Sequence, residues 1–277
     1  HDGFLDMPKN TNINLLNRWY VKTDDYTGQF LVRGLYDRRL GGQTEDALAV
    51  SPFASSPYHI DLNTWRVDGF VKNGYVFNHD LGTSIGIIAS ASYHNQQNTY
   101  GSRQWNAAQT NVYLNAIFQT SFDDLASDPW DNHQHKLSAG FSINYDKYDE
   151  SLSPSSLIAS QMEVTPGVFA EYTYTYKEKL TLLAGIREDY STRYGFFTTP
   201  RMNVRYAPFE WWTLRGSVGL GYRTPNAIAD NAAFLASNRI YDIHPELAQE
   251  RSMNTGISTV FYIPMGKREL QLSGEYY

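Results

Sequence analysis

The strongest constraint on the fold of this chain is a repeated alternation of apolar and polar residues. In residues 168–176 every second side chain is apolar or aromatic, from Val168 to Tyr176, and the residues between them include Glu171 and Thr173. A repeat of two places successive side chains on opposite faces of a β-strand. Run after run along the chain has this pattern, so the predicted sheet separates two environments. Its apolar face can meet either a packed core or lipid.

Composition narrows this choice. The chain has 277 residues, a formal net charge of −6, no cysteine and 15% aromatic residues. Without cysteine it has no disulfides, no thiolate metal sites and no cysteine nucleophile. No stretch of about 20 apolar residues is present, so membrane helices are excluded. A membrane β-barrel needs only alternating segments of about 10 residues around a polar lumen, which fits a mean hydropathy of −0.48. The acidic balance gives no support to a nucleic-acid partner.

The connections between strands indicate a barrel. Short turns alternate with longer polar segments, which fall at 40–60, 95–107, 148–164, 192–199 and 224–251. Outer-membrane barrels have this order because their periplasmic turns are short and their outer loops are long. A soluble β-sandwich has no reason to keep it. About twelve antiparallel strands are expected, near residues 11–20, 28–38, 61–72, 83–94, 108–120, 135–147, 165–176, 180–191, 200–207, 211–223, 252–263 and 268–277.

Aromatic residues near the strand ends favour a lipid environment for the apolar face. Trp and Tyr gather at both membrane interfaces, where the ring lies among headgroups and its polar end stays wet. Trp19, Tyr20, Tyr145, Trp211 and Trp212 lie near such ends. A large soluble sandwich, or a carbohydrate-binding β-protein, is the alternative. The residues expected to face lipid are Leu137, Phe141, Ile143, Leu182, Ile186, Leu214, Val218 and Leu220.

The chain is expected to be part of a barrel. It begins at His1 without a signal peptide, and its last strand stops abruptly at Tyr277. An open sheet of about twelve strands would leave two bare edges in a membrane, which is not tolerated. The set therefore either closes as a small barrel or belongs to a larger one. Residues 1–277 are interpreted as the middle strands of a barrel, without plug domain, signal peptide or C-terminal strands.

Several short motifs, taken in order, resemble one family. They are the tyrosine-rich hairpin at Tyr172, the strand end Gly185–Asp189, the strand entry Thr199–Arg201, the strand-to-loop junction Gly219–Asn226 and the strand entry Leu247–Glu250. Together they resemble the barrel of TonB-dependent outer-membrane receptors. The segments 66–77 and 93–120 are similar to the Bacteroidetes branch of that family, and the resemblance covers most of residues 60–277.

The resemblance implies a function. Such receptors have a 22-stranded barrel with a plugged lumen. In the outer membrane of Gram-negative bacteria they import a scarce, large ligand: a siderophore, haem, cobalamin, peptide or glycan. The implied partners are outer-membrane lipid, the imported ligand, the energy-coupling protein TonB acting through the plug, and in some cases a surface lipoprotein. No cofactor and no enzymatic activity are expected. By strand parity five arginines face the lumen, where they would line the plug interface: Arg187, Arg201, Arg205, Arg215 and Arg223.

Candidate ligand contacts lie in the outer loops. Long loops on a rigid scaffold commonly carry binding residues, and aromatic and arginine side chains are frequent binding anchors. The segment 232–236 could form a helical turn within the longest loop. Ordinary solvated loop chemistry is the alternative for each candidate. The candidates are Tyr100, Arg103, Trp105, Asn238, Arg239, Tyr241 and His244.

No metal site or catalytic site is predicted. His133 and His135 would share one strand face and could hold a metal, but they fall on the expected periplasmic side. The sequence has no GxSxG, HExxH or P-loop motif. Ser92 and His94 share one face of a strand, so a small self-closing barrel acting as a passive channel or membrane hydrolase is the alternative function.

Overall fold

The chain forms one large antiparallel β-sheet. The computed structural model describes residues 3–44, 57–122, 133–155, 157–237, 239–244 and 247–277. The strands of this sheet are β1 (Lys9–Lys22), β2 (Tyr26–Gly42), β3 (His59–Asn78), β4 (Thr83–Tyr100), β5 (Arg103–Ser121), β6 (His133–Ser153), β7 (Leu157–Tyr176), β8 (Leu180–Ser191), β9 (Gly195–Thr198), β10 (Arg201–Phe209), β11 (Trp212–Arg223), β12 (Glu250–Met265) and β13 (Arg268–Tyr276).

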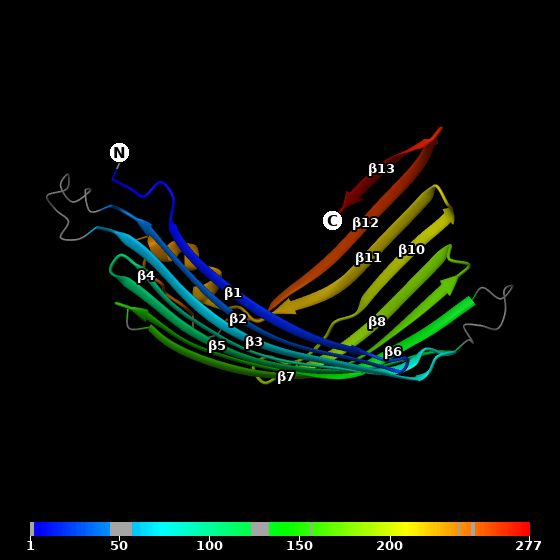
Figure 1. The fold of residues 1–277 in the computed structure, drawn as a ribbon, viewed down its shortest axis with the longest axis horizontal. Coiled ribbons are helices and arrows are strands. Elements are labelled where there is room, and N and C mark those ends of the chain that lie inside the picture. Colours follow the sequence, from blue (N-terminus) through cyan, green and yellow to red (C-terminus); the bar gives the residue numbers. More distant parts are fainter. Residues whose placement is uncertain (1–2, 45–56, 123–132, 156, 238, 245–246) are drawn as a thin grey trace.

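The sheet is a curved, open trough (Figure 1). Strands pair in chain order from β1 to β13, except that β9 pairs with β8 alone and β10 takes the next place beside β8. Among the described residues β1 pairs only with β2, and β13 only with β12. These strands therefore have two free edges and do not close on themselves. The prediction of an all-β, antiparallel sheet is confirmed.

Two details of the sequence prediction were wrong. The described residues form thirteen strands where about twelve were expected, and the additional strand β9 lies inside the segment expected to be the outer loop 192–199. The segments 95–107 and 148–164 are not long loops, since β4 and β5 continue to a tight turn at Gly101, and β6 and β7 approach each other similarly. Gly101 has φ +61, a left-handed conformation that glycine adopts readily. The run from His94 to Thr99 at the end of β4 is polar on both faces, so hydrophobic alternation stops there before the hydrogen-bonded ladder does.

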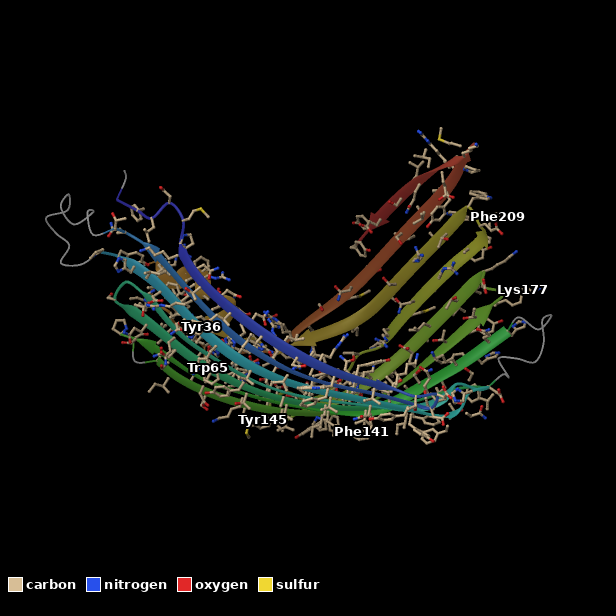
Figure 2. All side chains as sticks on the ribbon, viewed as in Figure 1. Tyr36, Trp65, Phe141, Tyr145, Lys177 and Phe209 are labelled. Carbon is tan, nitrogen blue, oxygen red and sulfur yellow. The ribbon has the colours of Figure 1, made fainter. Side chains whose placement is uncertain are left out.

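The two faces of the sheet differ in chemistry. Phe141 and Tyr145 lie on the convex face (Figure 2). On the opposite, concave face the Arg187 guanidinium donates to Ser142 Oγ at 2.6 Å and lies 5.9 Å from the Phe169 ring centre. Of the eight residues expected to face lipid, Leu137, Leu182 and Leu214 are half-buried. The others are exposed apolar side chains: Phe141, Ile143, Ile186, Val218 and Leu220.

The segment between β11 and β12, residues 224–249, is named here the β11–β12 loop. It contains the short helix α1 (Ala227–Asp230) and the 3-10 helix η2 (Ala232–Ala236), which confirms the expected helical turn. The Asn226 side chain caps α1 by accepting a hydrogen bond from the Ala229 N–H at 3.0 Å. Neither helical segment in the described part of the chain has the length and hydrophobicity to cross a bilayer.

The main buried apolar cluster lies where this loop meets the sheet. It consists of Trp105 from β5, Leu152 from β6, Ile228 from α1 and Leu235 from η2. Leu235 is 1% exposed and Trp105 is 4% exposed. Figure 1 shows the loop, in orange, within the hollow of the trough near the ends of β4 and β5. The core of the structure therefore docks one loop onto the concave face near the turn between β4 and β5.

Candidate functional site

The β11–β12 loop is tied at its start to two buried carboxylates. Thr224 Oγ1 donates to Glu163 Oε2 at 2.7 Å, and Asn226 Nδ2 donates to Glu150 Oε2 at 3.0 Å. Glu163 also accepts a hydrogen bond from the Ser191 hydroxyl. Hydrogen bonds to charged groups are stronger than neutral ones. These contacts hold the loop in the trough as soon as it leaves β11.

The rest of the loop is tied through its backbone. Arg103 Nη1 donates to the Ser237 carbonyl at 2.8 Å and to the Leu235 carbonyl at 3.3 Å. The Tyr58 hydroxyl donates to the Ala236 carbonyl at 3.1 Å. These carbonyls belong to the end of η2, where a short helix leaves acceptors without intrahelical donors. The side chains therefore satisfy the helix end and fix its position.

A cavity of about 400 Å³ opens within the loop. Arg239, Tyr241, Asp242 and His244 line it, together with apolar residues such as Phe234. The Arg239 guanidinium stacks 4.5 Å from the Phe234 ring centre. This wall offers a cation, a phenol, an imidazole, a carboxylate and aromatic surface, which is a mixture suited to a polar ligand with flat or anionic groups.

Tyr241 shapes the cavity through its hydroxyl. That hydroxyl donates to the Asn231 carbonyl at 2.7 Å, across the loop. Burial raises the pKa of Tyr241, while Arg103 and Arg239 act in the opposite direction. The phenol is therefore protonated at neutral pH and keeps its role as a donor.

The structure brings together the ligand-binding candidates that it describes. Arg239, Tyr241 and His244 line the cavity in the loop. The other three lie beneath that loop: Trp105 is in the buried cluster, Tyr100 packs against it, and Arg103 binds the loop carbonyls. Trp105 and Arg103 thus contact protein in this structure. Asn238 lies outside the described residues.

Sequence reasoning missed how the loop is held. From the sequence, no role is predicted for Glu150 or Glu163. The partner of Glu150 is 76 residues away in the sequence and that of Glu163 is 61 residues away. No local motif connects such distant residues. The only sign of these two residues in the sequence is that they are polar residues on a β-strand. Because the other strands also contain polar residues, this does not single them out.

The five arginines differ in their partners. Arg187 pairs with Asp189, Arg201 with Glu171, and Arg223 with both Asp230 and Glu250. Arg205 lies directly opposite Arg215 in the ladder between β10 and β11. Arg205 donates to the Glu178 carbonyl at 2.8 Å, and within the described ranges neither Arg205 nor Arg215 forms an ion pair.

The histidine and serine candidates form other contacts. His133 Nδ1 lies 2.7 Å from the Tyr174 hydroxyl, and His135 is hydrogen-bonded to Tyr172. Both histidines share the parity of Phe141, which is the convex face. Across the described residues no group of three potential metal ligands occurs. Within that same part of the chain no hydrogen bond joins Ser92 to His94.

Glu150 gives the loop attachment a pH dependence. Glu150 lies beyond Ile143, the last exposed apolar residue of β6, and near the C-terminal end of that strand. Burial raises the pKa of Glu150 above 4.5, and the hydrogen bond from Asn226 opposes this. A raised carboxyl pKa means that the folded state binds more protons, so stability falls as pH rises from 4.5 through the folded pKa.

The variant Glu150→Gln should remove this pH dependence. Gln keeps an oxygen that can accept from Asn226 but carries no buried charge. We expect the thermal midpoint of the full-length protein to fall less between pH 4.5 and pH 8 in the variant than in the wild type. Asp149→Asn is the control, because Asp149 is exposed and burial is not the main cause of its pKa shift. Equal slopes for wild type and Glu150→Gln would contradict the role of Glu150.

Comparison with known proteins identifies the family. The model of the TonB dependent receptor-like β-barrel matches residues 4–277. No curated protein sequence matches the chain significantly. Three solved structures share the fold at low sequence identity. The alcaligin outer-membrane receptor FauA of Bordetella pertussis has a TM-score of 0.61 and 12% identity, with 91% of this chain and 40% of that chain covered.

The other two are similar to the same extent. The ferric citrate transporter FecA, in its unliganded form, has a TM-score of 0.62 and 11% identity, covering 92% of this chain and 41% of that one. The hemophore receptor HasR of Serratia marcescens, a double mutant in complex with HasA and haem, has a TM-score of 0.66 and 13% identity, covering 97% and 44%. The chain thus spans less than half the length of each structure. The sequence match and the shared antiparallel sheet assign this chain to the family of TonB-dependent receptor β-barrels.

Proposed function

We propose that this chain is part of the barrel of an outer-membrane receptor that imports a scarce, large ligand by TonB-coupled active transport. The observation that carries the proposal is the cavity in the β11–β12 loop. It lies in the loop docked on the outer part of the concave face, and Arg239, Tyr241 and His244 line it. A ligand bound there would be held at the entrance of the lumen.

The chemistry of the cavity limits the ligand class. An arginine stacked on Phe234 can bind a carboxylate, a phosphate or another flat anionic group. Tyr241 and His244 add hydrogen-bonding atoms. The solved structures with this fold are by name a ferric citrate transporter, an alcaligin receptor and a hemophore receptor in complex with its hemophore and haem. A siderophore, haem, cobalamin, peptide or glycan all present polar groups that such a wall can bind.

The open sheet supports a larger barrel over a small closed one. The free edges of β1 and β13 expose backbone donors and acceptors, which a membrane does not tolerate. We infer that further strands complete the barrel in the whole protein and that a plug fills its lumen. The five arginines would then face the plug, and outer-membrane lipid would surround the convex face. A surface lipoprotein over the loops would be a further partner.

Energy dependence separates active import from a passive channel. Strains lacking the full-length gene should be grown with ferric siderophore, haem, cobalamin, peptide or glycan limiting in turn. We expect a growth defect on one of these, and expect a protonophore to stop uptake of that compound in the wild type. Uptake that continues at the same rate after the proton gradient collapses would favour the passive channel.

The residues that line the cavity are expected to determine the affinity for the imported compound. We expect Arg239→Ala and Tyr241→Ala, each in the full-length receptor, to weaken binding of the compound found by the growth screen by about 30-fold, the cost of roughly 2 kcal/mol typical of a binding anchor. Ala233→Ser is the control, since Ala233 is an exposed residue of the same loop that is not among the described residues lining the cavity. Unchanged affinity in both variants, with normal amounts of receptor in the membrane, would move the binding site away from this loop.

A further inference from the structure

Two of the five concave-face arginines carry charge that the sheet does not neutralise. Arg187, Arg201 and Arg223 each pair with a carboxylate of the same sheet or loop. Arg205 and Arg215 have no carboxylate partner anywhere in the described ranges. The nearest contact, from Arg205 to Glu178, goes to the backbone carbonyl and leaves the charge in place.

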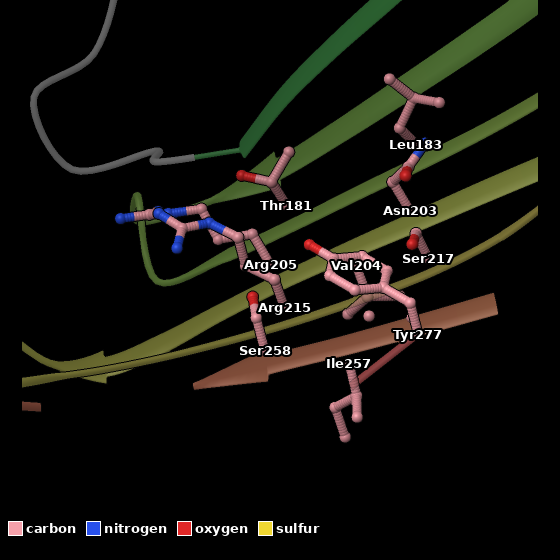
Figure 3. Close-up of a pocket in the computed structure, with 12 residues that line it drawn as sticks. Thr181, Leu183, Asn203, Val204, Arg205, Arg215, Ser217, Ile257, Ser258 and Tyr277 are labelled. Atoms are coloured by element: carbon pink, nitrogen blue, oxygen red, sulfur yellow. The ribbon is translucent and has the colours of Figure 1, made fainter. Parts of the chain in front are cut away.

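The two charges face each other. Arg205 on β10 and Arg215 on β11 are direct partners in the antiparallel ladder. Cross-strand partners point to the same face, and Figure 3 shows their guanidinium groups side by side. Like charges directly opposite on a sheet are destabilising. Arg205 also donates a hydrogen bond to the Glu178 carbonyl in the turn between β7 and β8, which fixes its side chain.

The surroundings of the pair are suited to an anion. A cavity of about 300 Å³ beside them is also lined by Thr181, Ser217 and Ser258, whose hydroxyls can donate hydrogen bonds. An adjoining hollow contains Lys177 and Lys179 as well as Glu178 and Glu210. Neither glutamate forms an ion pair with Arg205 or Arg215 in the part of the chain that the structure describes. The arginine side of this space is therefore positive and rich in donors.

We propose that Arg205 and Arg215 together bind one anionic group, a carboxylate or a phosphate, on the wall of the lumen near its periplasmic end. Two guanidinium groups can each offer paired N–H donors to such a group and turn mutual repulsion into attraction. The location in a lumen rests on the proposed barrel function. The same chemistry can come from a carboxylate side chain of a segment that fills the lumen, or from a free anion passing through it.

Thermal unfolding of the purified full-length receptor in detergent tests this directly. Wild type, Arg205→Gln, Arg215→Gln and the double variant are melted at pH 7.5 in 0 to about 100 mM sodium phosphate, with ionic strength held constant by sodium chloride. Arg201→Gln on the same face is the control, because Glu171 is its partner. Arg215→Lys keeps the charge and should stay close to wild type. The test needs no transport, so it is independent of the proposed import function.

The outcomes distinguish the source of the anion. If phosphate raises the wild-type midpoint, and the Gln variants lose this response while Arg201→Gln keeps it, the site takes a free anion. If wild type ignores phosphate, and each single variant lowers the midpoint as much as the double variant does, a carboxylate of the protein already fills the site. A third outcome is that either Gln variant melts at the same or a higher temperature than wild type and responds to phosphate in the same way. The substitution would then have removed only the repulsion between Arg205 and Arg215. That result would overturn the proposal.

Discussion

Replacing Val218 with arginine is expected to lower the stability of the barrel in a bilayer by roughly 2–4 kcal/mol, the cost of an arginine on a lipid-facing strand near the midplane. Val218 lies on β11 with an exposed apolar side chain, and its neighbour Leu220 on the same parity is exposed as well. The full-length receptor should be folded into lipid vesicles over a series of denaturant concentrations. The shift in the midpoint then measures the loss.

The adjacent residue provides the control. Ser217 has the opposite parity and lines the concave cavity beside Arg215. Ser217→Arg should place its charge in an aqueous space, where salt screens the added repulsion from Arg205 and Arg215, and should cost less than Val218→Arg. A larger loss at Ser217 than at Val218 would show that the two faces have been assigned in reverse.

Replacing Leu235 with aspartate is expected to release the β11–β12 loop from the sheet. Leu235 is almost fully buried against Ile228, Trp105 and Leu152. Removing a buried leucine side chain costs about 2–5 kcal/mol, and an unpaired carboxylate in its place adds to that. A loss of about 3 kcal/mol raises the population of the open loop by roughly 100-fold. The rate of trypsin cleavage after Arg239, followed by mass spectrometry, should rise accordingly.

Ala233→Asp is the matched control for this experiment. Ala233 belongs to the same short helix as Leu235 and is apolar, but it is exposed and lies away from the cleaved bond. Its replacement should leave the cleavage rate within about twofold of wild type, as for a surface position without special contacts. Equal cleavage of Leu235→Asp and wild type would mean that the apolar cluster does not hold the loop.

The sequence predicted the strands well wherever apolar and polar residues alternate regularly along them. Alternation of apolar and polar residues through strands such as β6 and β8 was sufficient to predict the antiparallel sheet and the parity of Phe141 and Ile186. The ends of β4 and β5 near Gly101 were missed, because the run from His94 to Thr99 is polar on both faces and alternation no longer marks the strand. The strand β9 was missed because it is only four residues long, which is too short to show a clear alternation of apolar and polar residues.

Only the part of the candidate site whose residues lie close together in the sequence could be predicted. Arg239, Tyr241 and His244 lie within six residues of each other in one loop, so a search for binding side chains in long loops finds them together. The role of Glu150 depends on Asn226, which lies in the β11–β12 loop, 76 residues further along the chain. Which arginines are neutralised, and which are not, likewise depends on the register between β10 and β11.

The cavity in the β11–β12 loop has a consequence for how such receptors diversify. The described residues that line it come from one segment, residues 227–247. The inward contacts Ile228 and Leu235 dock that segment, whereas Arg239, Tyr241 and His244 line the proposed binding cavity. On the proposed function, selectivity can change by exchange of this one segment, with the docking residues retained and the strands of the sheet left untouched. A chimera carrying the corresponding segment of another receptor would inherit a new preference without having to refold its barrel.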